Sequence, residues 1–227
     1  GIDYMPPVEL EFADVLESVL VADAVVAPDD EHGYRDALED NFGAFGIKRP
    51  LPGIVDLSQG PSPLYERMNY AVLRSDRDEV ERFLWENAEV FGIDREWQTR
   101  VEGIRPSIRF GPDGLLVSEA IAHYVQRLEL TAAEAGRRGV SVPEGVPPEM
   151  PLQLWGGGVM VFDQFGRAKL HHAKQLTDWE RQSRRLAYLW SHGLTDSKKR
   201  LGFTITTPRG QRFAALHVGS DYAGEEW

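Results

Sequence analysis

The chain has 227 residues, of which 42% are hydrophobic and 27% are charged, a balance typical of a globular protein with a buried core. It contains no cysteine, which excludes disulfides, thiol nucleophiles and cysteine-ligated metals within it and fits the reducing cytoplasm. A net charge of −11 disfavours nucleic acid and anionic lipid as partners, and no apolar run reaches the roughly 20 residues that span a bilayer.

Residues 1–47 are predicted to form a helical hairpin. Residues 1–7 run straight into the first helix, 8–26, so we expect the chain to continue a fold that begins upstream. A helical spacing of three and four places the apolar side chains of this helix on one face: Val8, Phe12, Val15, Leu16, Val19 and Val26. Pro28 ends it, and a second helix from about Asp30 to Phe45 should pack antiparallel against it.

Asp23 falls on the apolar stripe of the first helix, where a carboxylate needs a partner. Arg35 on the second helix is the candidate. We therefore predict a structural ion pair between Asp23 and Arg35 across the hairpin.

Residues 48–63 contain four prolines and two glycines, which predicts a linker. Two further helices are expected over 64–73 and 77–91, and these open an α+β module that runs from residue 64 to 193. Residues 194–227 are expected to hold a short strand at 203–206 and a flexible tail.

The module is predicted to contain two ββα units in tandem. Strands at about 99–110 and 115–130 flank a Gly-Pro-Asp-Gly turn, and strands at 152–162 and 167–173 flank an Asp-Gln-Phe-Gly turn. Capping boxes that begin at Thr131 and Thr177 predict a helix after each strand pair. These units should form a four-stranded antiparallel sheet with both helices on one face.

Gly156, Gly157 and Gly158 interrupt the third strand directly after Trp155. No Gly-Lys-Ser or Gly-Lys-Thr follows, so the glycines do not form a phosphate loop. Glycines within a strand indicate a bulge or the close approach of another backbone. The alternative is a groove in which a peptide or a partner strand lies along Trp155 to Gly158.

No pattern of catalytic or metal-binding residues is present. His171 and His172 are adjacent on a strand and should point to opposite faces, so they cannot readily chelate one metal. No histidine pair has the helical spacing of a zinc site, and no serine lies in a Gly-x-Ser-x-Gly elbow. A hydrolase that uses Asp163, His171 or His172 would need these side chains to converge in one pocket.

Two stretches carry a resemblance: residues 3–38, which begin Asp-Tyr-Met-Pro-Pro-Val-Glu-Leu-Glu-Phe, and residues 154–167, Leu-Trp-Gly-Gly-Gly-Val-Met-Val-Phe-Asp-Gln-Phe-Gly-Arg. They resemble the C-terminal region of large bacterial proteins whose upstream part looks like a gluzincin, a thermolysin-like zinc peptidase. In such peptidases a His-Glu-x-x-His helix supplies two zinc ligands and the general base. The chain has no His-Glu pair, so no catalytic or zinc-binding residue carries over.

The resemblance implies a non-catalytic C-terminal portion that packs against, or regulates, a catalytic lobe absent from this chain. Zinc would belong to that upstream lobe, and no cofactor is expected in the chain itself. The alternative is a stand-alone protein-binding or peptide-binding module that uses the glycine-interrupted strand. An unrecognised hydrolase is the third hypothesis.

Overall fold

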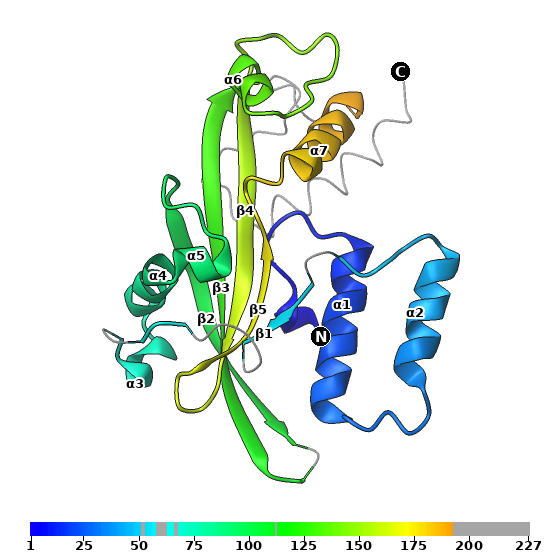
Figure 1. Ribbon diagram of the computed structural model, residues 1–227, viewed down its shortest axis with the longest axis vertical. Coiled ribbons are helices and arrows are strands. Elements are labelled where there is room, and N and C mark those ends of the chain that lie inside the picture. The colour runs from blue at the N-terminus through cyan, green and yellow to red at the C-terminus, as the bar shows by residue number, and fades with distance from the viewer. Residues whose placement is uncertain (51–52, 58–62, 66–67, 112, 193–227) are drawn as a thin grey trace, which may run out of the picture.

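The computed structural model describes residues 1–50, 53–57, 63–65, 68–111 and 113–192 (Figure 1). Within them, helices surround one antiparallel sheet, so the predicted α+β class is confirmed. The strand expected at 203–206 and the predicted tail lie outside the described residues. The elements in chain order are η1 Ile2–Tyr4, α1 Phe12–Val26, α2 Tyr34–Ala44, β1 Val55–Asp56, α3 Tyr70–Leu73, α4 Arg77–Glu86, α5 Ala88–Phe91, β2 Thr99–Phe110, β3 Leu116–Thr131, α6 Ala132–Arg137, β4 Pro151–Phe162, β5 Ala168–Lys174 and α7 Trp179–Ser191.

The sheet has five strands in the order β1-β5-β4-β3-β2, and the prediction of four strands is wrong. The additional strand, β1, comes from the segment 48–63 that was expected to be a linker. Val55 pairs with His171, and the Leu57 amide donates to the Lys169 carbonyl at 2.9 Å. A two-residue edge strand needs only a few such bonds, so the prolines around it do not prevent it.

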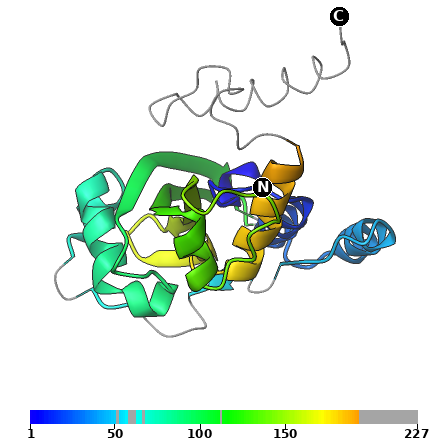
Figure 2. The same cartoon turned by 90° about the horizontal axis from the view of Figure 1, so that it is seen from above.

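One face of the sheet is covered by α3, α4 and α5, which lie on the opposite side from α1 (Figures 1 and 2). Val80, Phe83 and Leu84 of α4 are completely buried there. They pack with side chains of the sheet, among them Ala122, Tyr124, Met160 and Phe162. Phe83 and Leu84 lie three and four positions after Val80, which is the spacing that places side chains on one face of a helix.

The same face continues at the far end of β3 and β4, where α6 and α7 close a second cluster. Leu128, Leu154, Leu176 and Leu186 form its centre. The Thr131 capping box is present as predicted, whereas α7 is capped by Asp178 in place of Thr177. The division into two ββα units stays a prediction, and α1, from outside the predicted module, covers the other face of the sheet.

That other face packs on the N-terminal segment. Tyr4 forms a cluster with Ile121, Val159, Val161 and Leu170, and Val21 and Ala22 of α1 lie against it. Residues 1–26 therefore share a core with the sheet of the α+β module.

The apolar face expected on α1 is wrong in large part. Of its six members only Val8 and Leu16 are buried, while Phe12 is 72% exposed and Val26 is 51% exposed. The side turned to the sheet instead carries Asp14, Glu17 and Ser18, each at most 1% exposed. Periodicity counts apolar residues and cannot register that a buried carboxylate has a basic partner elsewhere in the chain.

The helix expected over 77–91 is divided into α4 and α5 at Asn87. The Asn87 side chain donates from Nδ2 to the carbonyls of Leu64 and Phe83 at 3.0 and 2.9 Å, and its Oδ1 accepts from the Leu64 amide at 2.5 Å. Asn87 thus forms hydrogen bonds with the backbone of Leu64, a distant segment, at the point where the helix is interrupted. Of the helix expected over 64–73, the described residues form only α3.

Candidate functional site

The glycine-interrupted strand lies inside the sheet. Gly157 pairs with Val125 of β3 and with Lys174 of β5, and Gly158 pairs with Tyr124 and Ala173. A Cβ added at Gly157 would lie 2.5 Å from the Tyr124 carbonyl, and one at Gly156 would lie 2.6 Å from the Leu176 amide. The glycines therefore allow neighbouring backbones to approach closely, and no open groove runs along them.

The backbone carbonyl of Trp155 is also occupied by the chain's own side chains. Its carbonyl accepts hydrogen bonds from Arg181 Nη2 at 2.8 Å and from Gln182 Nε2 at 2.9 Å. These two α7 side chains occupy the backbone position that a peptide would need beside Gly156. The predicted groove of Trp155 to Gly158 is thus filled by the chain itself.

Gly158 also leaves room for a buried pair of Tyr124 and His171. A Cβ at Gly158 would lie 2.8 Å from the Tyr124 hydroxyl, which lies 2.9 Å from His171 Nε2. Burial lowers the pKa of His171 to about 3 and raises the pKa of Tyr124. The pair is neutral at physiological pH and is enclosed by Phe91, whose ring centroid lies 4.8 Å from that of His171.

His172 points to the opposite face, toward α1. Its Nε2 lies 4.0 Å from Asp14 Oδ1, and its Nδ1 lies 3.3 Å from the Tyr4 carbonyl oxygen. The other carboxylate oxygen of Asp14 is 2.6 Å from Lys174 Nζ. Burial lowers the pKa of His172, although the Tyr4 carbonyl and Asp14 act in the opposite direction.

Glu9 holds the N-terminal segment against α7. Its carboxylate contacts the guanidinium groups of Arg181 and Arg185, the latter at 2.6 Å, and its carbonyl accepts from Lys174 Nζ at 2.6 Å. Glu9 has a φ of 47°, which is uncommon for a residue with a side chain. Burial raises its pKa despite the two arginines.

A third charged cluster surrounds Glu119, which is 3% exposed. Lys169 Nζ and Arg109 Nη2 donate to Glu119 Oε1 at 2.7 and 2.8 Å, and the Tyr4 hydroxyl donates to Oε2 at 3.2 Å. Burial by itself raises the carboxyl pKa, but the hydrogen bonds and charges of Lys169 and Arg109 outweigh it and hold the pKa of Glu119 below its usual value. A paired, enclosed carboxylate of this kind is structural.

Sequence reasoning missed these three clusters. Asp14 and Lys174, or Glu9 and Arg181, are too far apart in the chain for any spacing rule to connect them. One signal was available: Lys169 and Lys174 lie on a strand whose other residues are apolar or histidine, where an ammonium group needs a carboxylate.

The side chains of the hydrolase hypothesis do not converge. His171 and His172 face opposite sides of the sheet, and Asp163 lies in the β4–β5 turn, where it binds Arg167 Nε at 2.8 Å. Among the described residues, no three histidine, aspartate or glutamate side chains are grouped to hold a metal ion. No helix in the described ranges has the length and apolar composition needed to cross a membrane.

Asp23 and Arg35 lie in contact between α1 and α2, with 2.8 Å between Arg35 Nη1 and Asp23 Oδ2. The same guanidinium donates to the carbonyls of Ala27 and Pro28 at 2.8 and 2.9 Å. Arg35 therefore joins α2 to the turn that follows α1. Since α2 has no buried residue of its own, this contact is central to its position.

A shallow depression of about 340 Å³ lies between β3, α6 and the segment before β2. The Arg138 guanidinium lies 4.7 Å from the centre of the Trp97 ring and 3.7 Å from Glu96 Oε1. Glu129, Glu134 and Arg137 also line it. Its acidic and basic groups pair with each other, so the depression selects no ligand charge.

Large apolar side chains are exposed at many positions in the described part of the chain, and two groups of them are candidate contact surfaces. The first is the α1 ridge, formed by Phe12, Val19 and Val26 at intervals of seven residues, which align along one side of a helix. The second lies on the β2–β3 hairpin, where four large side chains are 59–70% exposed: Ile108, Phe110, Leu115 and Leu116.

Comparisons with protein-family models, with curated proteins and with solved structures give no match to the chain. The two exposed surfaces and the closed polar clusters are therefore the basis for assigning a function.

Proposed function

We propose that the chain is a non-catalytic interaction module of the cytoplasm that packs against a catalytic lobe of the thermolysin-like zinc peptidase class through the α1 ridge. The observation that carries the proposal is the exposed apolar line on α1. This helix buries Asp14 and Glu17 together with Leu16 and Leu20, and it leaves Phe12, Val19 and Val26 exposed. The class of the partner rests on the resemblance of residues 3–38 and 154–167 to gluzincin-containing proteins.

The chemistry of the ridge supports a protein partner. Fully burying a valine or phenylalanine side chain contributes about 1.5–3 kcal/mol, so three such residues in a line are a substantial anchor. The polar side of α1 is already used by Lys174 and His172, which holds the helix in one rotation. The ridge is thus presented in a fixed orientation, which lowers the entropy lost on binding.

The coding sequence upstream of Gly1 gives the first test. An in-frame His-Glu-x-x-His with a downstream glutamate supports the proposal. A start codon close to Gly1 without such a motif contradicts it and leaves a stand-alone binding module.

Association provides the second test, with the upstream polypeptide expressed as a separate chain and binding followed by analytical ultracentrifugation. Val19→Glu should abolish the complex, because it places a charge in an apolar contact. Val90→Glu is the matched control, since Val90 on α5 is 37% exposed and Val19 is 39% exposed. Equal binding by both variants removes the ridge from the interface.

The second candidate function, peptide binding along the glycine-interrupted strand, lacks the free backbone that it requires. β4 is paired on both sides from Gly157 to Phe162. Among the described residues, β2 pairs on one side only, with β3.

A further inference from the structure

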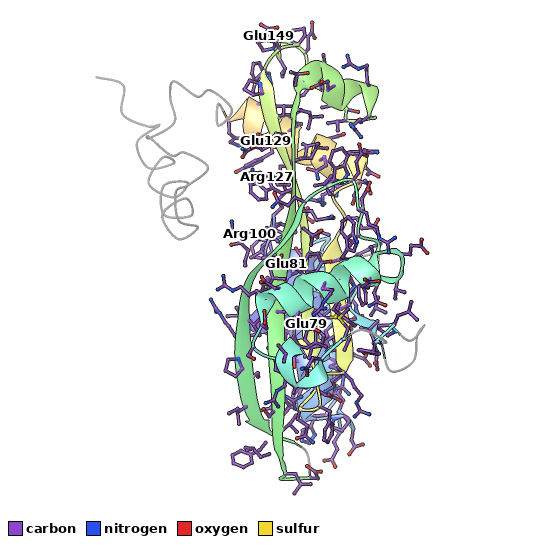
Figure 3. All side chains as sticks on the ribbon, turned by 90° about the vertical axis from the view of Figure 1, so that its left-hand side faces the viewer. Glu79, Glu81, Arg100, Arg127, Glu129 and Glu149 are labelled. Atoms are coloured by element: carbon purple, nitrogen blue, oxygen red, sulfur yellow. The ribbon has the colours of Figure 1, made fainter. Side chains whose placement is uncertain are left out.

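The β2–β3 hairpin extends beyond the rest of the sheet. β3 begins at Leu116, but its pairing with β4 begins only at Ala120. The end of β2 and the start of β3 therefore form a two-stranded ribbon, at the bottom of Figures 1 and 3, without a third strand in the described chain. Figure 3 also shows α4 crossing the sheet above this ribbon.

The outer edge of β2 is covered at one end only. Near α4, the Glu81 carboxylate accepts a hydrogen bond of 2.7 Å from the Val101 amide and so satisfies one edge donor. Beyond this point, from Pro106 to Phe110, no described backbone group pairs with the outer edge.

The hairpin geometry identifies the groups on this edge. The Gly111 amide donates to the Leu115 carbonyl at 2.7 Å, which makes these two residues a hydrogen-bonded pair. Because hydrogen-bonded and non-hydrogen-bonded pairs alternate in antiparallel strands, Phe110, Ile108 and Pro106 direct their backbone groups outward. Proline has no N–H, so the edge offers the donors of Ile108 and Phe110 and three carbonyl acceptors.

The two faces of the ribbon differ in chemistry. One face carries Ile108, Phe110 and Leu116, which are 65%, 70% and 59% exposed. The other face of β2 carries Arg105 and Arg109. Arg109 binds Glu119, whereas Arg105 has no ion-pair partner among the described residues.

We propose that the β2 edge from Pro106 to Phe110 binds an extended protein segment in which apolar residues alternate with aspartate or glutamate. Such a segment adds a strand through backbone hydrogen bonds. Its apolar side chains continue the Ile108–Phe110 face, and its carboxylates lie on the same face as Arg105. This surface is separate from the α1 ridge and requires neither the peptidase lobe nor the resemblance.

A second copy of the chain fits this edge less well. Antiparallel pairing of β2 with itself through the outward-facing residues keeps even-numbered residues opposite even-numbered ones. Arg105 of both copies then lies on one face, where the two like charges repel and neither is compensated, whereas Arg109 is paired with Glu119. An acidic, alternating segment removes that repulsion. Because of this charge complementarity, we favour an acidic segment over a second copy of the chain as the partner.

The test titrates the full chain with a fluorescently labelled peptide of alternating valine and glutamate, about seven residues long. Anisotropy should report saturable binding that is at least about tenfold tighter than that of the corresponding valine–lysine peptide. Arg105→Glu should reverse this preference. Equal affinity for both peptides overturns the charge argument.

Ile108→Pro tests the backbone contact, and Ile108→Thr is its matched control. Both variants remove the isoleucine, but only proline removes the outward N–H, and Pro106 already occupies an equivalent position without breaking the ribbon. Binding to Ile108→Pro should be weaker by about fivefold or more. Equal binding by the two variants contradicts strand addition, and if the proline variant fails to fold, the Arg105→Glu reversal still decides.

A third experiment, with vesicles of phosphatidylcholine and phosphatidylserine, tests whether the hairpin binds a lipid surface. The proposal expects the chain to stay in the supernatant when such vesicles are sedimented. The proposal is overturned if the chain binds no peptide but sediments with the vesicles, and if Phe110→Ser abolishes this sedimentation. That result would assign the hairpin to a lipid surface.

Discussion

The two faces of β5 bury neighbouring histidines in opposite surroundings. His171 contacts the Phe91 ring and the Tyr124 hydroxyl on the face that α3–α5 cover with apolar side chains. His172 lies near Asp14 on the face that α1 covers with carboxylates. Both imidazoles are almost completely enclosed, at 6% and 2% exposure. The difference therefore lies in the chemistry of the covering helix and not in depth.

This comparison shows two ways to exclude water from one sheet. The apolar face depends on volume and shape, so its stability is distributed over many contacts. The α1 face adds buried ion pairs to its apolar cluster, and the loss of one partner there leaves a buried charge. Substitutions on each face should consequently fail in different ways.

The largest effect is expected on the apolar face, with Phe83→Ala. Phe83 is completely buried and its ring packs on those of Tyr65, Phe91 and Phe162. Its truncation should lower the free energy of unfolding by about 3–5 kcal/mol. Urea denaturation gives the value, and Phe83→Leu is the control with a smaller cavity. A loss below that of Phe83→Leu would show that this face is not close-packed.

On the α1 face, Asp14→Ala should cost about 3 kcal/mol, because the buried Lys174 ammonium loses its nearer carboxylate and keeps only the more exposed Glu11, 3.2 Å away. The double variant Asp14→Leu, Lys174→Met should recover much of this loss, since two well-packed apolar side chains need no pairing. Urea denaturation of the three proteins measures both effects. Additive losses in the double variant would refute the idea that pairing is what this face requires.

The two histidines should contribute differently to the loss of stability at acidic pH. The pKa of His171 is about 3 in the fold against about 6.5 in an unfolded chain, so the unfolded state binds more protons between these values. Stability from His171 is complete above pH 6.5 and falls as the pH falls, by about 2 kcal/mol at pH 5. His171→Gln should therefore flatten the dependence of unfolding free energy on pH.

His172→Gln should flatten the pH dependence of the unfolding free energy less than His171→Gln. Asp14 and the Tyr4 carbonyl favour the protonated ring of His172 and partly oppose the effect of burial. Glu9, whose pKa is raised, acts in the opposite sense and loses stability as the pH rises. Its contribution is common to all variants and cancels between them. If His172→Gln changes the slope of unfolding free energy against pH more than His171→Gln does, the prediction is wrong.

The smallest effect is expected on the outer side of α1. Val19→Ala should change the free energy of unfolding by less than about 0.5 kcal/mol, because this residue contributes little to the core. Leu16→Ala, one turn away and 1% exposed, should cost about 2–5 kcal/mol. Thermal unfolding distinguishes the two, and comparable losses would mean that α1 is buried on both sides.

Elements governed by near neighbours were predictable. The β2 and β3 strands, the turn between them and the Thr131 capping box occur where the sequence places them. β1 was missed because its pairing partner, β5, lies more than a hundred residues away. The break at Asn87 was missed for the same reason, since it depends on the backbone of Leu64.

Among the candidate sites, the predicted Asp23–Arg35 contact is present at 2.8 Å, but its premise was wrong, because the stripe that carries Asp23 is largely exposed and the Asp23 side chain is 40% exposed. For the glycine-interrupted strand a bulge or a close backbone approach was expected, and the glycines show the close approach, whereas the register shift of β4 lies between Val161 and Phe162. Only the order of strands shows that the chain itself makes that approach, from Leu176, Tyr124 and His172.

The sequence by itself determined the α+β class, the two strand hairpins and the Thr131 cap, because turn and capping preferences act between residues a few positions apart. Only the tertiary structure decided which side of α1 is buried. That choice depends on the basic and imidazole side chains of β5, which stabilise Asp14 across roughly 160 residues of chain. The same choice leaves the α1 ridge exposed, and with it the surface on which the proposed function rests.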